Sequence, residues 1–294
     1  MSFLIYVSLF VIGTAVGSFL NVMSLRFNPE EDRLWKNVYG RSHCPHCGKT
    51  LSWYELVPFF SFLAQLGKCR SCGVRLTLQY PIVEFLGGLI FFPVPYALLP
   101  YNIVILGIPY VLIILWILVL LSLLLMSVID FHHHIIPDSI NLFILALGVI
   151  LIAYRYFGFE HNSLGGYSYL KSYAMLFPLS DSFPWAYLLG FGFGGLLLGA
   201  LYYFSGGRGM GFGDVKLAAV LGLFIGWPDI MLALGLAFVL GGFLSVGLLA
   251  LHSRTMKDHL PFGPFIALGF TIIFFFGEKL MGLYFNFFNL LLPF

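Results

Sequence analysis

The run LIILWILVLLSLLLMSVID at residues 112–130 decides the fold, because a long, almost uninterrupted apolar segment ends at a single acid. An α-helix needs about 20 predominantly apolar residues to cross the hydrocarbon core of a bilayer. The run has no strict alternation of apolar and polar residues, so it does not fit a strand of a membrane barrel. It therefore predicts a transmembrane helix that ends at Asp130.

The whole chain shares the character of this run. Of its 294 residues, 60% are hydrophobic and 10% are charged, whereas ordinary soluble domains carry about 25% charged residues. Inside lipid, each apolar stretch must satisfy its backbone hydrogen bonds within a helix. We predict an all-α polytopic membrane protein with about eight transmembrane helices, at 3–24, 81–97, 102–129, 139–154, 185–204, 214–227, 229–251 and 264–285. Pro or Gly interrupts or ends the spans at 81–97 and 214–227, so seven or nine crossings also fit.

The basic residues predict an orientation. Arg26 and Arg33 follow the first span and no basic residue precedes it, so the positive-inside rule places the N-terminus outside. No cleavage pattern ends this span, and we interpret it as an uncleaved anchor. Eight alternating spans then place residues 25–80 and three short loops in the cytoplasm, where, with Lys216, they hold twelve of the fifteen Lys and Arg residues.

All four cysteines lie between the first two spans, in two CxxC pairs. Cys44 and Cys47 are separated by 21 residues from Cys69 and Cys72. Two such turns can place four thiolates around one Zn²⁺. Paired disulfides or a redox dithiol are alternatives, but the reducing cytosol disfavours disulfides. We predict a structural zinc site in a small zinc-ribbon-like domain whose folding depends on the metal, and we expect His46 to face solvent.

Five acids lie at or inside the predicted spans, where ionised groups are costly and are often functional. Asp229 has the position of an N-cap in an outer turn, Asp138 resembles a helix start after proline, and Glu84 resembles a packed or paired acid. Asp130 and Asp214 differ, because one ends a span and the other begins a span on the same cytoplasmic side.

Two carboxylates at one depth can meet and share a proton. Such a pair is the equipment of an aspartic protease, in which one carboxylate activates water and the other, protonated, polarises the scissile carbonyl. The three histidines at 132–134 face different ways on a helix, so we expect a polar cluster at the membrane interface; the alternative is that one of them tunes Asp130.

Asp214 is carried by the run GMGFGDVK at residues 209–216. The run is no phosphate-binding loop, because it follows no strand and lacks the Lys-Ser/Thr pair. Its alternating glycines allow unusual dihedral angles and the close approach of another segment. The pattern favours a mount for the acid, and a plain hinge remains an alternative.

These motifs together resemble the type IV prepilin peptidases, which are membrane aspartic proteases of the GxGD class. The resemblance covers nearly the whole chain and is carried by GSFLNV (17–22), WYELVPFFSFL (53–63), GKCRSC (67–72), QYPIVE (79–84), VIDFHHHIIPD (128–138), GMGFGDVK (209–216) and LPFGPFIALG (260–269). It places the family's catalytic pair on Asp130 and Asp214. It also divides the chain into a first transmembrane helix at 1–26, a cytoplasmic four-cysteine domain at 27–80 and a transmembrane aspartic protease domain at 81–294.

The resemblance implies a substrate and a second reaction. The substrates would be precursors of type IV pilins or type II secretion pseudopilins, cut at the cytoplasmic face after the glycine that ends a basic leader. Members with the cysteine domain commonly also transfer a methyl group from S-adenosylmethionine to the new N-terminal residue, although no nucleotide-binding fingerprint identifies the cofactor-binding residues. The implied location is the bacterial cytoplasmic (inner) membrane, with lipids as further contacts and no nucleic acid partner.

Two other classes of function remain open. A proton-coupled transporter could use the same paired carboxylates, but it would usually have repeat symmetry and a site at the bilayer midplane. A zinc-binding membrane assembly factor would need only the cysteine domain, and it would leave the GMGFGDVK run without a role.

Overall fold

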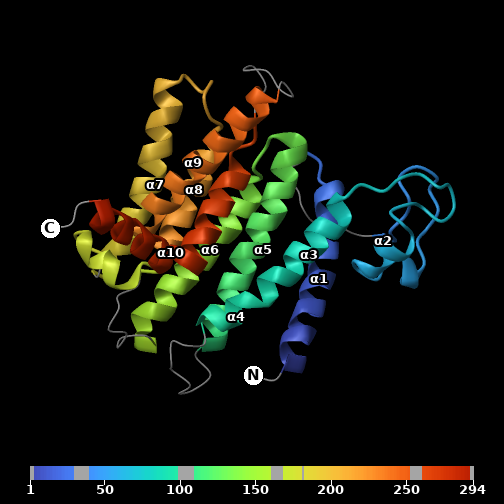
Figure 1. Cartoon of the computed structure of the whole chain (residues 1–294), viewed down its shortest axis with the longest axis horizontal. Coiled ribbons are helices and arrows are strands. Elements are labelled where there is room, and N and C mark those ends of the chain that lie inside the picture. The colour runs from blue at the N-terminus through green and yellow to red at the C-terminus, as the bar shows by residue number, and fades with distance from the viewer. Residues whose placement is uncertain are drawn as a thin grey trace. The chain divides into compact units, whose positions relative to one another are not determined.

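The structure, a computed structural model, describes residues 3–29, 40–98, 109–159, 168–180, 182–251 and 260–291. The described residues are mostly helical, and their only β pairing is two isolated bridges in the cysteine region. The chain divides into two compact units, Met1–His133 and His134–Phe294. Figure 1 shows the helices of both units.

Seven helical segments of the described chain are long and apolar enough to cross a membrane. They are Phe3–Leu25, Gln79–Leu98, Tyr110–His133, Asp138–Phe157, Trp185–Phe204, Asp229–Ala250 and Gly263–Phe287. The all-α membrane class is therefore confirmed, and each of these segments matches a predicted span. The first seven residues of the span predicted at 102–129, and Arg33, lie outside the described residues. The span predicted at 214–227 corresponds to α8 (Phe212–Ile225), which has 14 residues and a length of about 21 Å.

The first unit contains α1 (Phe3–Leu25), the cysteine region with the short helix α2 (Phe60–Ala64), α3 (Gln79–Phe91), α4 (Pro93–Leu98) and α5 (Pro109–His133). Helices α1 and α3 pack side by side (Figure 1).

Small residues allow α1 and α3 to approach closely. A Cβ atom added to Gly13 of α1 would lie 2.6 Å from the Gly87 carbonyl oxygen, and one added to Gly87 would lie 2.6 Å from the Gly13 carbonyl oxygen. Close contact between glycine faces is a common way for helices to associate in lipid. The α1–α3 pair gives the cysteine region two fixed points, because the region leaves the end of α1 and returns at the start of α3.

The second unit contains α6 (Asp138–Tyr154), α7 (Trp185–Phe204), α8, α9 (Asp229–Ala250) and α10 (Gly263–Leu291), with a π-helical turn at Arg155–Phe159 and a 3₁₀ turn at Lys171–Leu176. Helix α8 is the centre of this unit, since it contacts α6, α7, α9 and α10. Ten of its 14 residues are buried. It is thus a core helix, enclosed by protein.

Helices α7 and α8 make the closest packing of the second unit. Gly190 of α7 lies against the backbone of Gly222, and Gly194 lies against the backbone of Ala218. A Cβ atom at either α7 glycine would collide with a carbonyl oxygen of α8. Because backbone cannot move aside as a flexible side chain can, these contacts fix the position of α8 against α7.

Candidate active site and metal centre

Asp130 lies in the last turn of α5 and is 4% exposed. The preceding turn contributes Met126 and Ile129, which are both fully buried. An ionised carboxylate in such surroundings is costly unless it has a task or a partner. The structure therefore agrees with the sequence in placing a buried acid at the end of an apolar helix.

The three histidines next to Asp130 do not converge on one point. His132 contacts the Val128 carbonyl oxygen through Nδ1 at 2.9 Å, the His133 ring packs edge-on against Phe27 at 5.7 Å, and His134 is exposed with a φ of 53°. Within the described residues, the one group that could hold a metal ion is made of cysteines and includes none of these histidines.

Asp214 lies in the first turn of α8 and is 7% exposed. Its Oδ2 accepts a hydrogen bond of 3.1 Å from the backbone N–H of Gly211. The carboxylate thereby occupies the N3 position of a capping arrangement, and an acid is favoured there because the helix N-terminus carries partial positive charge. The start of α8 thus holds this side chain in one orientation.

The glycines around Asp214 act through close approach. A Cβ atom at Gly213 would lie 3.1 Å from the Cβ of Ile136, and one at Gly211 would lie 3.2 Å from Asp214 Oδ2. The expectation of unusual dihedral angles at Gly209, Gly211 and Gly213 is wrong, because the positive φ angles occur at the preceding Gly206 and Gly207. The run therefore allows α8 to pack against Ile136, in the segment before α6. The left-handed turn lies before the run, at Gly206 and Gly207.

An ion pair joins α8 to the start of α6. Lys216 Nζ contacts both carboxylate oxygens of Asp138 at 2.8 Å and lies 5.1 Å from the centre of the Phe212 ring. Asp138 is the first residue of α6, as predicted, but its carboxylate also makes this contact between helices. Lys216 is in the first half of α8, so the ion pair supports the turn that carries Asp214.

Asp130 belongs to the first unit and Asp214 to the second. The structure confirms that each is buried at a helix end. That the two carboxylates meet remains a prediction from the sequence.

Two of the remaining acids bind backbone N–H groups. Glu84 on α3 is 7% exposed, and its Oε2 accepts the Phe59 N–H at 2.7 Å, so the prediction of a packed acid is confirmed. Asp229 begins α9, but Pro228 is the N-cap. The prediction that Asp229 is the N-cap is therefore wrong, and its side chain is fully buried.

Asp229 joins α9 to the segment before α7. Its Oδ1 accepts hydrogen bonds of 3.1 Å from the Ser168 hydroxyl and from the Tyr169 N–H. The sequence did not indicate Ser168, because it lies 61 positions before its acceptor in the chain. This carboxylate has a structural task that explains its burial.

The two CxxC pairs fold into matching turns. In the first, the Gly48 N–H donates to the Cys44 carbonyl oxygen at 2.9 Å, and in the second the Gly73 N–H donates to the Cys69 carbonyl oxygen at the same length. Gly48 and Gly73 have φ angles of 68° and 69°, which favour glycine.

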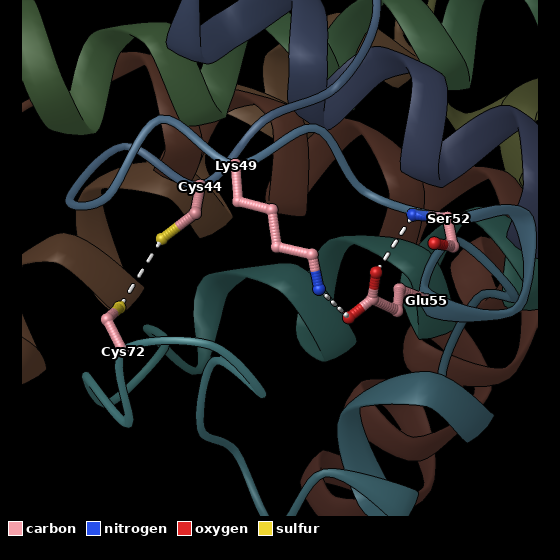
Figure 2. A network of polar contacts seen from close by, with 5 residues as sticks. All are labelled: Cys44, Lys49, Ser52, Glu55 and Cys72. Atoms are coloured by element: carbon pink, nitrogen blue, oxygen red, sulfur yellow. Dashed lines mark hydrogen bonds and ion pairs between the residues drawn. The ribbon is translucent and has the colours of Figure 1, made fainter.

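The four sulfur atoms lie within 4.8 Å of one another, so the cluster could hold a metal ion. Cys44 Sγ and Cys72 Sγ are 3.9 Å apart (Figure 2), close to the roughly 3.8 Å edge of a tetrahedron with Zn–S bonds of about 2.3 Å. All four cysteines are free of disulfides. His46 is exposed, as expected. The geometry therefore fits a four-thiolate metal site.

The thiols of the second pair have opposite changes in pKa. Backbone N–H groups of Cys72 and Ser71 lower the pKa of Cys69 to about 6. The Val74 N–H also favours a thiolate at Cys72, but desolvation and the three neighbouring sulfurs outweigh it and raise the pKa of Cys72 to about 11. A bound divalent cation would remove this conflict, because each ligand binds as a thiolate.

A polar network next to the cysteines was missed by the sequence analysis. Glu55 Oε2 accepts the Ser52 N–H at 2.8 Å, and Glu55 Oε1 lies 3.8 Å from Lys49 Nζ (Figure 2). The side chain of Glu55 is 2% exposed. The Ser52-x-x-Glu55 spacing of a capping box was the signal that could have found it.

Two family models match the chain. The bacterial peptidase A24 N-terminal domain matches residues 11–98, and the type IV leader peptidase family matches residues 117–246. The second match contains both Asp130 and Asp214. No solved structure matches the chain significantly.

Curated relatives align over nearly all of the chain. A protein from Aeromonas hydrophila is 30% identical, covering 94% of this chain and 92% of its own length. One from Pseudomonas aeruginosa is 30% identical with the same coverage, and one from Burkholderia pseudomallei is 30% identical over 91% of this chain and 84% of its own length. All three are named prepilin leader peptidase/N-methyltransferase.

Proposed function

The chain belongs to the type IV leader peptidase family, and from this premise we propose that it cleaves the leader from type IV prepilins or pseudopilins and methylates the new N-terminus. The observation that carries the proposal is the pair of buried acids. Asp130 and Asp214 each lie at the end of an apolar helix, and both fall within the family match.

The proposed cleavage is a hydrolysis without a covalent intermediate. One carboxylate of the pair takes a proton from water, the water oxygen attacks the scissile carbonyl carbon, and the other carboxylate, protonated, donates to the carbonyl oxygen. The amide nitrogen leaves as an amine after it receives a proton. The hydrogen bond from Gly211 to Asp214 Oδ2 would keep that carboxylate in position through the reaction.

The substrate would meet the pair at the membrane surface. The apolar segment of the pilin would lie among the helices, and its basic leader would remain in the cytoplasm. The positive-inside pattern supports this orientation, with the N-terminus outside and the cysteine domain and both acids on the cytoplasmic side of a bacterial inner membrane.

We assign zinc to the four-cysteine cluster. The matched turns, the 3.9 Å sulfur separation and the all-sulfur ligand set support it, because structural zinc sites are commonly tetrahedral and built from cysteine. The metal would hold the two turns together in a domain that otherwise has little core. It would be structural, since all four positions are filled by protein ligands.

The methyl donor would be S-adenosylmethionine, which supplies an electrophilic methyl group when bound. In the transfer, the free amine of the new N-terminal residue forms a C–N bond as the C–S bond breaks, the sulfur keeps the electron pair, and the amine gives up a proton. The protein's contribution would be to hold the two reactants in line.

The test of the catalytic pair is cleavage of a prepilin by the purified chain in detergent. We expect Asp130→Asn and Asp214→Asn each to abolish leader removal, measured as loss of the leader mass from the product, because neither variant can hold the shared proton. Glu278→Gln is the control, since its side chain is 44% exposed and pairs with Lys171, and it should retain cleavage.

Full cleavage by either of the first two variants would remove that residue from the mechanism. If the chain were a transporter or an assembly factor, even the wild-type protein would leave the prepilin uncut.

A further inference from the structure

A pocket of about 250 Å³ lies in the first unit, where α1 and α3 meet the cysteine domain. Its lining comes from three parts of the chain that are far apart in sequence. Its polar and aromatic side chains include Ser18, Arg26, Glu55, Phe62, Tyr80 and Glu84. Neither proposed catalytic acid lines it, so the cleavage reaction does not explain it.

Two buried carboxylates line this pocket. Glu55 has a side chain that is 2% exposed, and Glu84 is 7% exposed with the Ser18 hydroxyl beside it. Cys44 also lines the pocket, and a zinc ion with four thiolates carries a net charge of about −2. Only Lys49, 3.8 Å from Glu55, pairs with either acid among the described residues. The side of the pocket that holds Glu55 and Glu84 therefore favours a cation.

The backbone next to Glu84 is held in a rare conformation. Phe59 has a φ of 63°, an unfavourable value for a bulky residue, and its N–H donates to Glu84 Oε2 at 2.7 Å. Strained residues of this kind concentrate at ligand sites, where surrounding contacts maintain them. The hydrogen bond thus fixes both the loop and the direction of the carboxylate.

The pocket also presents a cationic group and aromatic rings. Arg26 is half-buried, and its guanidinium donates to the Arg41 carbonyl oxygen at 3.2 Å, in addition to other contacts. Arginine binds carboxylates with two parallel hydrogen bonds. The rings of Tyr80 and Phe62 are half-buried and give flat apolar surface for a heterocycle.

We propose that this pocket binds the S-adenosyl sulfonium methyl donor, an inference that rests on the methyl transfer proposed above. The donor combines a permanent cation, a carboxylate and a purine ring, and the lining offers a complementary group for each. Glu55 and Glu84 face the positive charge, Arg26 binds the carboxylate, and Tyr80 and Phe62 cover the purine. The pocket is slightly smaller than the roughly 300–1,000 Å³ of most small-molecule sites, so part of the ligand would lie at the open rim.

The charge of the ligand gives a sharp test. S-adenosylhomocysteine has nearly the same shape as the donor but lacks the methyl group and the sulfonium charge, while it keeps the α-ammonium group. In calorimetric titrations of the purified full-length chain, Glu84→Gln and Glu55→Gln should each weaken binding of S-adenosylmethionine by about 10- to 100-fold, the loss expected for one charged interaction. The same variants should weaken binding of S-adenosylhomocysteine by less than about threefold, because it lacks the charge that the carboxylates face.

The controls separate this proposal from a folding defect and from the proposed function. Glu278→Gln, a matched change at an exposed glutamate of the second unit, should leave both affinities unchanged. Equal losses for the two ligands in the pocket variants would mean that the glutamates are only structural, and no loss would overturn the assignment. A wild-type chain that cleaves prepilin but binds neither ligand would instead overturn the proposed methyl transfer.

A second measurement needs no variant. The wild-type chain is irradiated with an azidoadenosyl analogue of the donor and digested, and the labelled peptides are identified by mass. Label within residues 18–26 or 42–84, competed away by excess S-adenosylmethionine, is the expected result. Label that is confined to residues 134–294 would place the donor in the second unit and overturn the proposal.

Discussion

At the scale of single residues, burial separates acids that look alike in the sequence. Asp138 and Asp229 both follow proline and both begin a helix. The Asp138 carboxylate is 61% exposed, whereas Asp229 is fully buried between α9 and the segment at 168–169. The same local pattern therefore serves a surface ion pair in one place and an internal hydrogen-bonding centre in the other.

We expect Asp229→Ala to lower the thermal unfolding temperature of the purified chain markedly. The change leaves the Ser168 hydroxyl and the Tyr169 N–H buried without their acceptor, at about 1–3 kcal/mol for each group. Asp229→Asn keeps an acceptor oxygen and should lose less. Asp138→Ala is the control and should cost no more than about 1 kcal/mol, because exposed ion pairs contribute little; equal losses at 138 and 229 would contradict this account.

The sequence predicts the burial of an acid when that burial depends only on where the acid stands in an apolar run. Asp130 and Asp214 stand at the ends of apolar runs, so their burial at helix ends followed from counting residues. The Glu55 hydrogen bond to Ser52 follows a capping-box spacing that the sequence contains, but the contact of Asp229 with Ser168 joins segments that are distant in the chain. That contact could not be inferred without the fold, because its partners are brought together only by tertiary packing.

At the scale of helices, glycine positions on α7 distinguish a packed face from an open one. Gly190 lies against the backbone of α8, whereas a Cβ atom on Gly192 would meet nothing within 4 Å. The two residues are on the same helix and differ only in what faces them. This pair therefore offers a matched comparison of packing in one element.

Gly190→Ala should destabilise the chain, because the added methyl group collides with the carbonyl oxygen of Gly222 and α7 must move away from α8. The expected cost is about 1–3 kcal/mol, typical of overpacking a close contact. Gly192→Ala should be neutral or stabilise the chain by up to about 1 kcal/mol, since alanine favours the helix. Unfolding temperatures measured by intrinsic fluorescence in detergent would decide; a larger loss at 192 than at 190 would show that the packing is wrong.

Helix existence was predictable from apolar length, and so was the proline interruption of the span at 81–97, which is two helices, α3 and α4, with Pro93 at the break. The surroundings of α8 were not predictable. The predicted span at 214–227 is shorter than a bilayer core, and an apolar run gives no indication of whether lipid or protein will surround it.

At the scale of the whole chain, the metal site should control the stability of the cysteine domain. Metal analysis of the purified chain should find about one zinc per molecule. Removing the metal with a strong chelator should lower the unfolding temperature, because binding free energy becomes folding free energy in small metal-dependent domains. Cys47→Ser should show the same lower temperature without chelator, and no further decrease when chelator is added.

Two results would contradict the prediction of a structural metal. Disulfides in place of free thiols, or a chain that keeps its unfolding temperature after chelation, would refute a structural metal. The sequence alone predicted the clustering of the four cysteines, since their spacing is local. It could not predict that the pocket would lie beside the site, because the pocket also needs the ends of α1 and α3.

The short length of α8 has a consequence for how this chain meets its membrane. The helix is about 21 Å long, against a hydrocarbon thickness of about 30 Å, and a lipid-exposed helix of that length would force the bilayer to thin around it. Ten of its 14 residues are enclosed by neighbouring helices instead, so the lipids fit themselves to longer segments such as α7 and α9. The end of α8 that carries Asp214 is therefore positioned by its protein neighbours, and its depth does not depend on matching the thickness of the bilayer.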